Sequence, residues 1–173
     1  MSKPDIAIKR LGPTDAGAWR DIRLAALKDA PEAFGQTFEH TSTQPFEHFS
    51  QAVSGANPIF AAGGVDRLVG TAGFYVMGGP KQSHRGQLWG MFVAPEYRNT
   101  GIGKALIEAV IGYARDLVEQ VHLTVVAENA GAYRLYRQMG FQVYGVEPRA
   151  LSYNGRFYDE VLMVRWLNCK GAG

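Results

Sequence analysis

The order of the apolar segments restricts the folds open to this chain more than any other feature. In the first half, strand-like runs follow one another at 6–11, 58–64, 67–77 and 86–93. In the second half, helical and strand-like runs alternate, at 101–118, 121–127, 130–139, 141–146 and 157–167. Strands that first meander and then alternate with helices predict a mixed α/β sheet. Because no repeat, linker or low-complexity tract divides residues 1–173, we expect a single domain.

Two helices are expected between the first strands. Thr14 is a candidate N-cap for the first of them. The apolar face that follows at helical spacing consists of Trp19, Ile22, Ala26 and Leu27. A weaker helical pattern lies between Thr43 and Val53. The runs 58–64 and 67–77 are separated by a short turn at Gly64, Val65 and Asp66, which predicts a β-hairpin.

Composition excludes several classes of function. The net charge of +2 is too small to act as a nucleic-acid footprint, so no nucleic-acid partner is expected. No apolar run approaches the ~18 residues of a membrane span, and the start MSKPDIAIKR has no apolar core of a signal peptide. The single cysteine, Cys169, cannot form an internal disulfide and is expected to be a free, non-catalytic thiol. These features predict a cytoplasmic protein in a reducing compartment.

The segment FVAPEYRNTGIGKALIEAV, at 92–110, passes from an apolar strand through a polar bend into a helix. Glycines at Gly101 and Gly103 let a bulky anion approach the unpaired N–H groups of a helix N-terminus. Arg98 and Lys104 add positive charge there. The bend therefore predicts phosphate binding, although glycine pairs at such bends also occur as plain turn chemistry. The helix face expected to pack on the sheet consists of Ile102, Ala105, Leu106, Ala109, Val110, Tyr113 and Leu117.

Two motifs then point to one family. The bend is neither a G-x-x-x-x-G-K-[ST] loop nor a dinucleotide-binding turn with three glycines. The segment RNTGIG, 98–103, matches instead the [Q/R]-x-x-G-x-[G/A] pyrophosphate loop of the GNAT superfamily of N-acetyltransferases. The later segment NAGAYRLYRQMGF resembles the N-x-x-A-x-x-L-Y-x-x-x-G-F block of the same superfamily. Its matching residues are Asn129, Ala132, Leu135, Tyr136, Gly140 and Phe141.

The resemblance implies an α/β fold of the GNAT type: a mixed, mostly antiparallel central sheet flanked by helices on both faces, with a splayed parallel pair. It implies acetyl-CoA as the acyl donor and no metal. The backbone of Met91, Phe92 and Val93, together with Asn129, would contact the pantetheine arm. The pyrophosphate would be held by Arg98 and by the N–H groups of Asn99, Thr100, Gly101, Ile102, Gly103 and Lys104.

The implied reaction is direct transfer of the acetyl group to a primary amine, with Tyr136 near the thioester as the general acid that protonates the leaving thiolate. The residues alone leave structural alternatives open. Asn129 is also a favourable helix N-cap, and Tyr136 lies on an apolar helical stripe that is typical of a core. Tyr133, which lies off the stripe of Leu135 and Tyr136, is the nearest alternative tyrosine.

The general base and the acceptor are less constrained. In this family the strand at 86–93 frequently carries an acid, but here it offers Gln87 and Trp89. Candidates for the base are Glu32, Glu39, His84, Glu96, Glu128 and Asp159. Candidates for the acceptor wall are Glu32, Phe34, Phe38, Glu39, Tyr153 and Tyr158. This acidic and aromatic set suits a cationic amine, so a small amine or an amino acid is favoured over a protein N-terminus.

Two further alternatives accompany this interpretation. The absence of a strand carboxylate leaves open a catalytically inactive acyl-CoA-binding module that serves as a sensor or partner domain. A nucleotide-binding protein of another fold is a more distant alternative. Exposed strand edges make a homodimer plausible.

Overall fold

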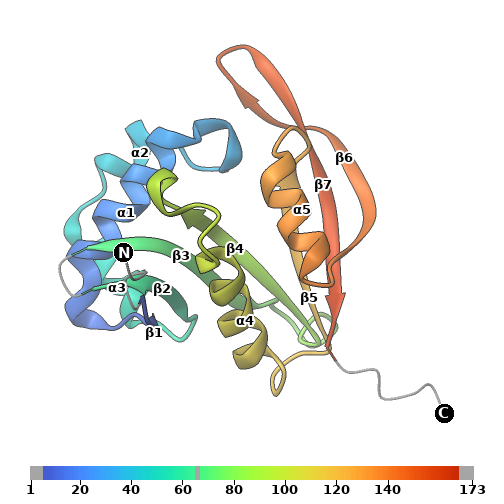
Figure 1. Cartoon of the computed structure of the whole chain (residues 1–173), viewed down its shortest axis with the longest axis horizontal. Helices are drawn as coiled ribbons and strands as arrows, with labels where there is room; N and C mark the ends of the chain where they lie inside the picture. Colours follow the sequence, from blue (N-terminus) through green and yellow to red (C-terminus); the bar gives the residue numbers. More distant parts are fainter. Residues whose placement is uncertain (1–5, 65–66, 168–173) are drawn as a thin grey trace.

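The computed structural model of the chain describes residues 6–64 and 67–167. Its centre is a seven-stranded sheet with the strand order β1-β2-β3-β4-β5-β7-β6 (Figure 1). The strands are β1 Ile8–Arg10, β2 Ile59–Gly63, β3 Leu68–Val76, β4 Arg85–Val93, β5 Gln120–Val126, β6 Gln142–Tyr153 and β7 Arg156–Trp166. The β4–β5 pair is parallel and the other neighbouring pairs are antiparallel. The expectation of a mixed, mostly antiparallel sheet is therefore confirmed.

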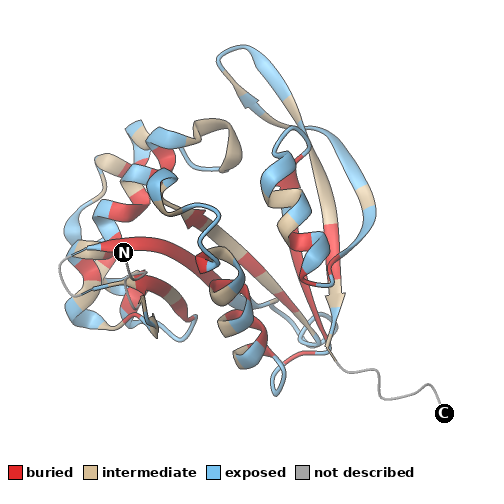
Figure 2. Ribbon diagram, in the orientation of Figure 1, coloured by how far each residue is buried: buried red, intermediate tan, exposed pale blue. Residues whose placement is uncertain are grey.

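Helices cover both faces of this sheet, as expected. The helices are α1 Ala16–Asp29, α2 Phe38–Ser42, α3 Phe46–Ser54, α4 Ile102–Ala114 and α5 Ala130–Gln138, with 3-10 turns at η1 Pro13–Asp15, η2 Pro31–Ala33 and η3 Pro95–Tyr97. On β2, Ala61 packs with the core of α1 and α3, whereas its neighbour Ala62 packs with the core of α4 and α5. Successive strand residues point to opposite faces, so the two cores lie on opposite sides of the sheet. Figure 2 shows the buried residues concentrated along the central strands and the helix faces that meet them.

Two helices differ from the sequence prediction at their ends. Helix α4 ends at Ala114, not Val118, and the chain turns just beyond it, where the Leu117 N–H donates to the Ala114 carbonyl (3.0 Å). Leu117, predicted to pack on the sheet, is therefore 48% exposed, while Ile107 and Ile111 are buried. The expected helix at 43–53 is α3, and the unpredicted α2 before it has only five residues, too few to show a helical period.

The hairpin predicted near residue 65 is present, and one later strand is longer than predicted. The β2–β3 hairpin is confirmed, while Val65 and Asp66 of its turn lie outside the described residues, as does Cys169. Strand β6 continues to Tyr153, well beyond the predicted 141–146. Register shifts near Gly145 and after Glu147 interrupt its alternation, which hides the second half of the strand from a period-two pattern. In the described part of the chain no helix is both long and apolar enough to cross a bilayer.

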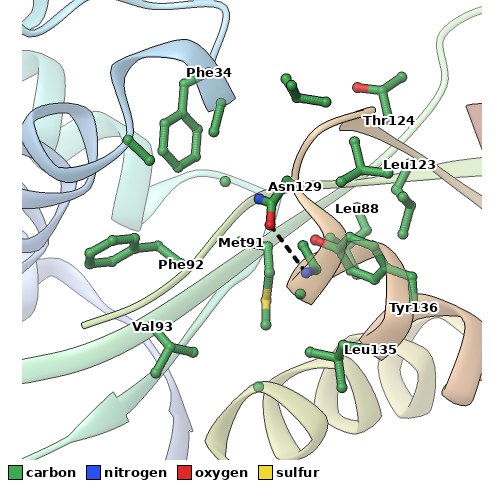
Figure 3. A pocket seen from close by; sticks show the side chains of 18 of the residues that line it. Phe34, Leu88, Met91, Phe92, Val93, Leu123, Thr124, Asn129, Leu135 and Tyr136 are labelled. Carbon is green, nitrogen blue, oxygen red and sulfur yellow. Dashed lines mark hydrogen bonds between the residues drawn. The ribbon is translucent and has the colours of Figure 1, made fainter. Parts of the chain in front are cut away.

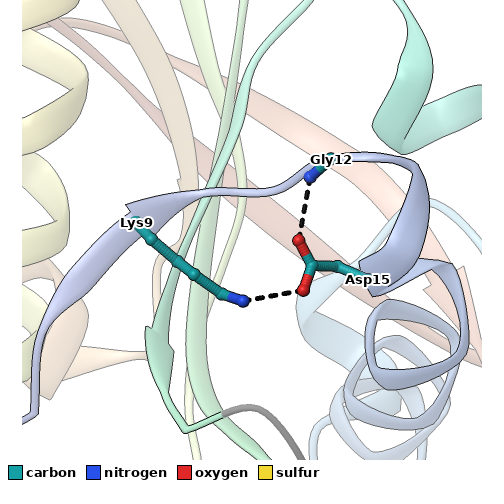
Figure 4. Close-up of polar contacts among 3 residues, drawn as sticks. All are labelled: Lys9, Gly12 and Asp15. Atoms are coloured by element: carbon teal, nitrogen blue, oxygen red, sulfur yellow. Dashed lines mark hydrogen bonds and ion pairs between the residues drawn. The ribbon is translucent and has the colours of Figure 1, made fainter.

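The assignment of Thr14 as the N-cap of α1 is wrong. Pro13–Asp15 forms the 3-10 turn η1 before the helix, and the Asp15 carboxylate organises that turn (Figure 4). It accepts a hydrogen bond from the Gly12 N–H (2.9 Å) and an ion-paired hydrogen bond from Lys9 Nζ (2.7 Å). Because Lys9 lies on β1, this carboxylate fixes the start of α1 relative to the sheet.

A pair of glycine substitutions tests the packing of the sheet. A Cβ on Gly86 would lie 2.3 Å from the ring of Phe74, which is fully buried, so Gly86→Ala is expected to lower the free energy of unfolding by ~1–3 kcal/mol. Gly112, exposed on α4, has open space at its Cβ position. Gly112→Ala is expected to raise the free energy of unfolding by ~0.5–1 kcal/mol. Urea denaturation followed by circular dichroism measures both; equal effects of the two variants would contradict the packing argument.

The turn at Asp15 predicts a specific dependence of stability on pH. The Lys9 ammonium and the Gly12 N–H lower the pKa of Asp15 below its ordinary value of 3.8. The stabilisation is therefore full above pH 3.8 and is lost as pH falls through the folded-state pKa. Asp15→Asn is expected to lower the free energy of unfolding by roughly 1 kcal/mol at pH 7, with a difference from wild type that shrinks in acid. Asp116→Asn, at an exposed position, serves as the control and is expected to show neither effect.

Candidate active site

The parallel pair β4–β5 holds together over a short length only. Residues 85–87 pair with 120–122, and beyond Gln87 the two strands diverge. The divergence opens a cavity of about 1560 Å³, here called the β4–β5 cavity, whose lining side chains appear in Figure 3. Its walls come from β4, β5, β7, the bend and first turn of α4, most of α5, and the segment around η2 with part of α1. The edge of β4 at 88–93 therefore faces the cavity without a ladder partner on β5.

A bulge at Gly90 shapes the same strand. The register between β3 and β4 slips between Thr71 and Gly73, and Gly90 has a φ of 61°. The Thr71 hydroxyl donates to the Gly90 carbonyl (3.1 Å) and holds the bulge. A positive φ favours glycine at this point. Met91, Phe92 and Val93, the residues expected to contact pantetheine, follow directly and line the cavity.

The bend before α4 reaches the cavity as the sequence predicts. Gly101 has a φ of 93°, and its Cβ position is open space. The Ala105 N–H donates to the Gly101 carbonyl (3.0 Å), so the N–H groups of 102–104 precede the first hydrogen bond of the helix. Such N–H groups and the helix dipole favour an anion. Of the predicted residues in the bend, those that line the cavity are Arg98, Asn99, Gly101, Gly103 and Lys104.

Three residues of the bend have structural roles as well. A Cβ on Gly103 would lie 2.9 Å from Leu135 Cδ2, so glycine at this position also favours close packing of α4 against α5. The Thr100 hydroxyl donates to the Tyr97 carbonyl (2.5 Å). The Ile102 side chain is buried in the core. The side chains of Thr100 and Ile102 are not part of the cavity wall, so only their backbone could serve a ligand.

Arg98 is engaged by the protein itself. Its guanidinium forms an ion pair with Asp29, the last residue of α1, and its Nε donates to the Val93 carbonyl (3.0 Å). Arg98 therefore joins α1, β4 and the bend at one corner of the cavity. Asp29 was not predicted as its partner, because the two residues are far apart in the chain.

Asn129 and Tyr136 each combine a structural and a cavity-lining position. The Asn129 side chain accepts from the Ala132 N–H (3.2 Å), so it is the N-cap of α5, and it also lines the cavity. Tyr136 is 5% exposed and packs edge-to-face on Phe141, with 5.9 Å between ring centroids. Figure 3 shows its ring projecting from α5 with the hydroxyl toward the cavity. Burial raises the pKa of Tyr136, so its hydroxyl stays protonated. Tyr133 packs against the core instead.

The candidate bases separate into two groups. Glu32 and Glu128 line the cavity; Glu39, His84, Glu96 and Asp159 are not part of its wall. Glu96 pairs with Arg67 (2.5 Å), and Asp159 accepts from the Arg149 N–H (2.7 Å). Glu128 pairs with Arg156 (3.0 Å).

Sequence reasoning missed Glu160. This carboxylate lines the cavity and accepts a hydrogen bond from the Thr124 hydroxyl (3.1 Å). Burial, and secondarily the nearby Glu147, raises the pKa of Glu160. The alternation of β7 could have identified this residue. Tyr158 was predicted to line the site, and Glu160, not Asp159, lies on the same face of the strand as Tyr158.

The residues predicted for the acceptor wall separate into two groups. Glu32, Phe34 and Tyr158 line the cavity, whereas Phe38, Glu39 and Tyr153 do not; Lys28 Nζ lies 4.4 Å from the ring centroid of Phe38. Gln87 and Trp89 line it as expected. Arg23 of α1 is an unpredicted member of the wall. In the described ranges, no group of three or more histidine, cysteine, aspartate or glutamate side chains is placed to hold a metal ion.

Comparisons with known proteins agree with this geometry. A family model described as the acetyltransferase (GNAT) family matches residues 19–141. The L-amino acid N-acetyltransferase AaaT of Escherichia coli is 26% identical over 93% of this chain and 98% of its own. The aminoglycoside N(6')-acetyltransferase type 1 of Stenotrophomonas maltophilia is 28% identical over 78% of this chain and 85% of its own.

Solved structures share the fold. A GNAT-family acetyltransferase from Streptococcus pneumoniae superimposes with a TM-score of 0.81 at 23% identity, covering 95% of this chain and all of the other. A Salmonella typhimurium protein solved with its cofactor acetyl-CoA gives a TM-score of 0.84 at 19% identity, covering 98% of each chain. The family model spans most of the chain, and these two structures superimpose on nearly all of it. The chain therefore belongs to the acetyltransferase (GNAT) family.

Proposed function

We propose that this N-acetyltransferase transfers the acetyl group of acetyl-CoA directly to the amine of a small molecule. The observation that carries the proposal is the β4–β5 cavity, which joins a helix N-terminus suited to phosphate with a buried tyrosine hydroxyl. A cosubstrate with an anionic end and a reactive end fits such a cavity. The relatives with named acceptors include enzymes acting on an amino acid and on an aminoglycoside, which supports a small acceptor.

The donor would lie along β4. The N–H groups of 102–104, with Lys104 and Arg98, would hold the pyrophosphate, while the free edge of 91–93 and Asn129 would take the pantetheine arm. An extended strand edge offers alternating N–H and C=O groups to an amide-bearing chain. Acetyl-CoA supplies the activated acetyl group when it is bound. Arg98 would share its charge between the pyrophosphate and Asp29.

The reaction would need two proton movements. The neutral amine nitrogen forms a bond to the thioester carbon, the carbon–sulfur bond breaks, and the leaving thiolate takes the proton of the Tyr136 hydroxyl. The proton lost by the amine passes to Glu160, which lies on a rigid strand and is oriented by Thr124. A carboxylate whose pKa is raised by burial is a better base than an exposed one.

The inactive binding module is not favoured. Two relatives that match most of the chain are named as acetyltransferases, and Tyr136 lies in the cavity wall. Thiol release from acetyl-CoA, followed over amines, amino acids, aminoglycosides and peptides, separates transfer from binding alone. A homodimer through an exposed strand edge stays a prediction.

Tyr136→Phe tests the general acid. Loss of the hydroxyl is expected to lower kcat by roughly 10²–10⁴-fold while the Kd for CoA stays near that of wild type, since the ring still packs on Phe141. Steady-state thiol release gives kcat, and calorimetric titration with CoA gives Kd. Tyr133→Phe, three residues earlier on α5, is the matched control and is expected to keep full activity. An unchanged kcat for Tyr136→Phe would contradict the assignment.

Glu160→Gln tests the base through the pH profile. Because the pKa of Glu160 lies above its ordinary value of 4.5, wild-type kcat/KM is expected to fall as pH drops through that raised pKa. The variant is expected to lose roughly 10²-fold or more in kcat/KM at neutral pH and to lose this acidic limb. The adjacent Asp159→Asn, whose side chain is directed at the Arg149 N–H, should retain both. Equal profiles for Glu160→Gln and wild type would remove Glu160 from the mechanism.

A further inference from the structure

Arg23 is a buried cation whose charge the protein leaves uncompensated. It lies on α1 and is 8% exposed. In the described residues its Nη1 has no hydrogen-bond partner, and none of the ion pairs found there includes it. A buried charge without a partner strongly disfavours the folded state, so such groups are normally paired. Burial lowers the pKa of Arg23 to about 10, which still leaves it charged at neutral pH.

The guanidinium is nevertheless held in one orientation. Its Nη2 donates to Gln36 Oε1 (3.0 Å), and its Cζ lies 4.9 Å from the ring centroid of Phe34. These contacts engage one edge and the stacking surface of the guanidinium and leave the buried Nη1 without a hydrogen-bond partner. A planar guanidinium fixed in this way is prepared to bind a planar oxyanion.

The unpartnered nitrogen lies beside the strand that forms one wall of the cavity. A Cβ on Gly90 would lie 3.8 Å from Nη1, so the nitrogen sits beside the β4 bulge, next to the strand segment proposed to take the pantetheine arm. Arg23 lines the β4–β5 cavity together with Phe34, Gln36 and Gly90. Arg98 and Lys104, which would hold the pyrophosphate, belong to the bend before α4, so Arg23 is a separate positive group.

We propose that Arg23 binds a carboxylate of the acceptor, and that the acceptor is therefore an amino acid. This inference rests on the proposed function and narrows its acceptor class. The carboxylate would accept from the unpartnered Nη1 of Arg23 and so hold the neighbouring amine in the cavity that Glu160 also lines. An aminoglycoside has no carboxylate, and in a peptide the carboxylate next to the N-terminal amine is consumed in an amide bond.

The other two buried polar atoms without partners do not define this site. Trp89 Nε1 lies against Gly73 of β3, where a Cβ would come within 2.5 Å of it, so it is enclosed by the sheet. Thr41 Oγ1 belongs to α2 and is not part of the cavity wall. Of these three residues, Arg23 alone combines a charge, a fixed orientation and a place in the cavity wall.

Acceptor series on the full chain test the proposal. Thiol release is measured for each of a panel of L-amino acids, for its carboxamide and for the amine left when the carboxylate is removed. Wild type is expected to prefer the amino acid by roughly 10- to 100-fold in kcat/KM, the effect of one charge-assisted hydrogen bond pair. Arg23→Gln is expected to abolish this preference and to keep the KM for acetyl-CoA. Arg20→Gln, at an exposed position on α1, is expected to behave as wild type.

A second variant and a binding measurement complete the test. Arg23→Lys keeps the charge without the planar fork, so it is expected to retain part of the preference, and it replaces Arg23→Gln if that variant does not fold. Calorimetric titration of the CoA-loaded protein with the preferred amino acid reports binding without turnover. Equal rates with acid, carboxamide and amine would overturn the proposal and leave the transferase function intact. Arg23-dependent binding of the amino acid without thiol release would support the site and overturn the proposed reaction.

Discussion

The short pairing of β4 with β5 is the constraint on which the site depends. Only 85–87 and 120–122 join the two parts of the sheet in parallel, so the strand ends beyond them are free to separate. The separation turns one edge of β4 into a wall and brings α5 across from α1 and η2. Each proposed contact, from the helix N-terminus of α4 to Tyr136 and Arg23, lies on this opening. A longer ladder would close the space and pair the same peptide groups with each other.

Much of this arrangement was predictable from sequence, because local patterns encode it. The bend before α4, the N-cap at Asn129 and the stripe containing Tyr136 are short-range features, and the structure has them where the residues predict. Features that depend on partners distant in the chain were missed. The pairing of Arg98 with Asp29 and the burial of Arg23 arise only when α1 meets β4 and the bend. Glu160 is an intermediate case. It was missed, although the alternation of β7 places it on the same face of the strand as Tyr158, which was predicted.

Several residues of the cavity wall also stabilise the fold. Asn129 caps α5, Gly103 lets α4 approach Leu135, and the Tyr136 ring packs on Phe141. The structural and the ligand-binding interpretation of such residues therefore do not compete. A substitution at one of these residues changes both the stability of the fold and the binding of a ligand, unless it removes only one functional group, such as a hydroxyl. This is why hydroxyl and charge deletions that keep the shape of the side chain separate the two roles best.

Burial of Tyr136 also determines the range of pH in which an acid and a nucleophile exist together. An α-ammonium group releases its proton near pH ~8 and an alkylammonium near ~10, so neutral amines accumulate in alkaline solution. An ordinary phenol, with a pKa near ~10, would lose its proton over much of the same range. The raised pKa of Tyr136 keeps its proton in place there. Burial thus keeps the Tyr136 hydroxyl protonated at an alkaline pH at which a phenol in water would ionise.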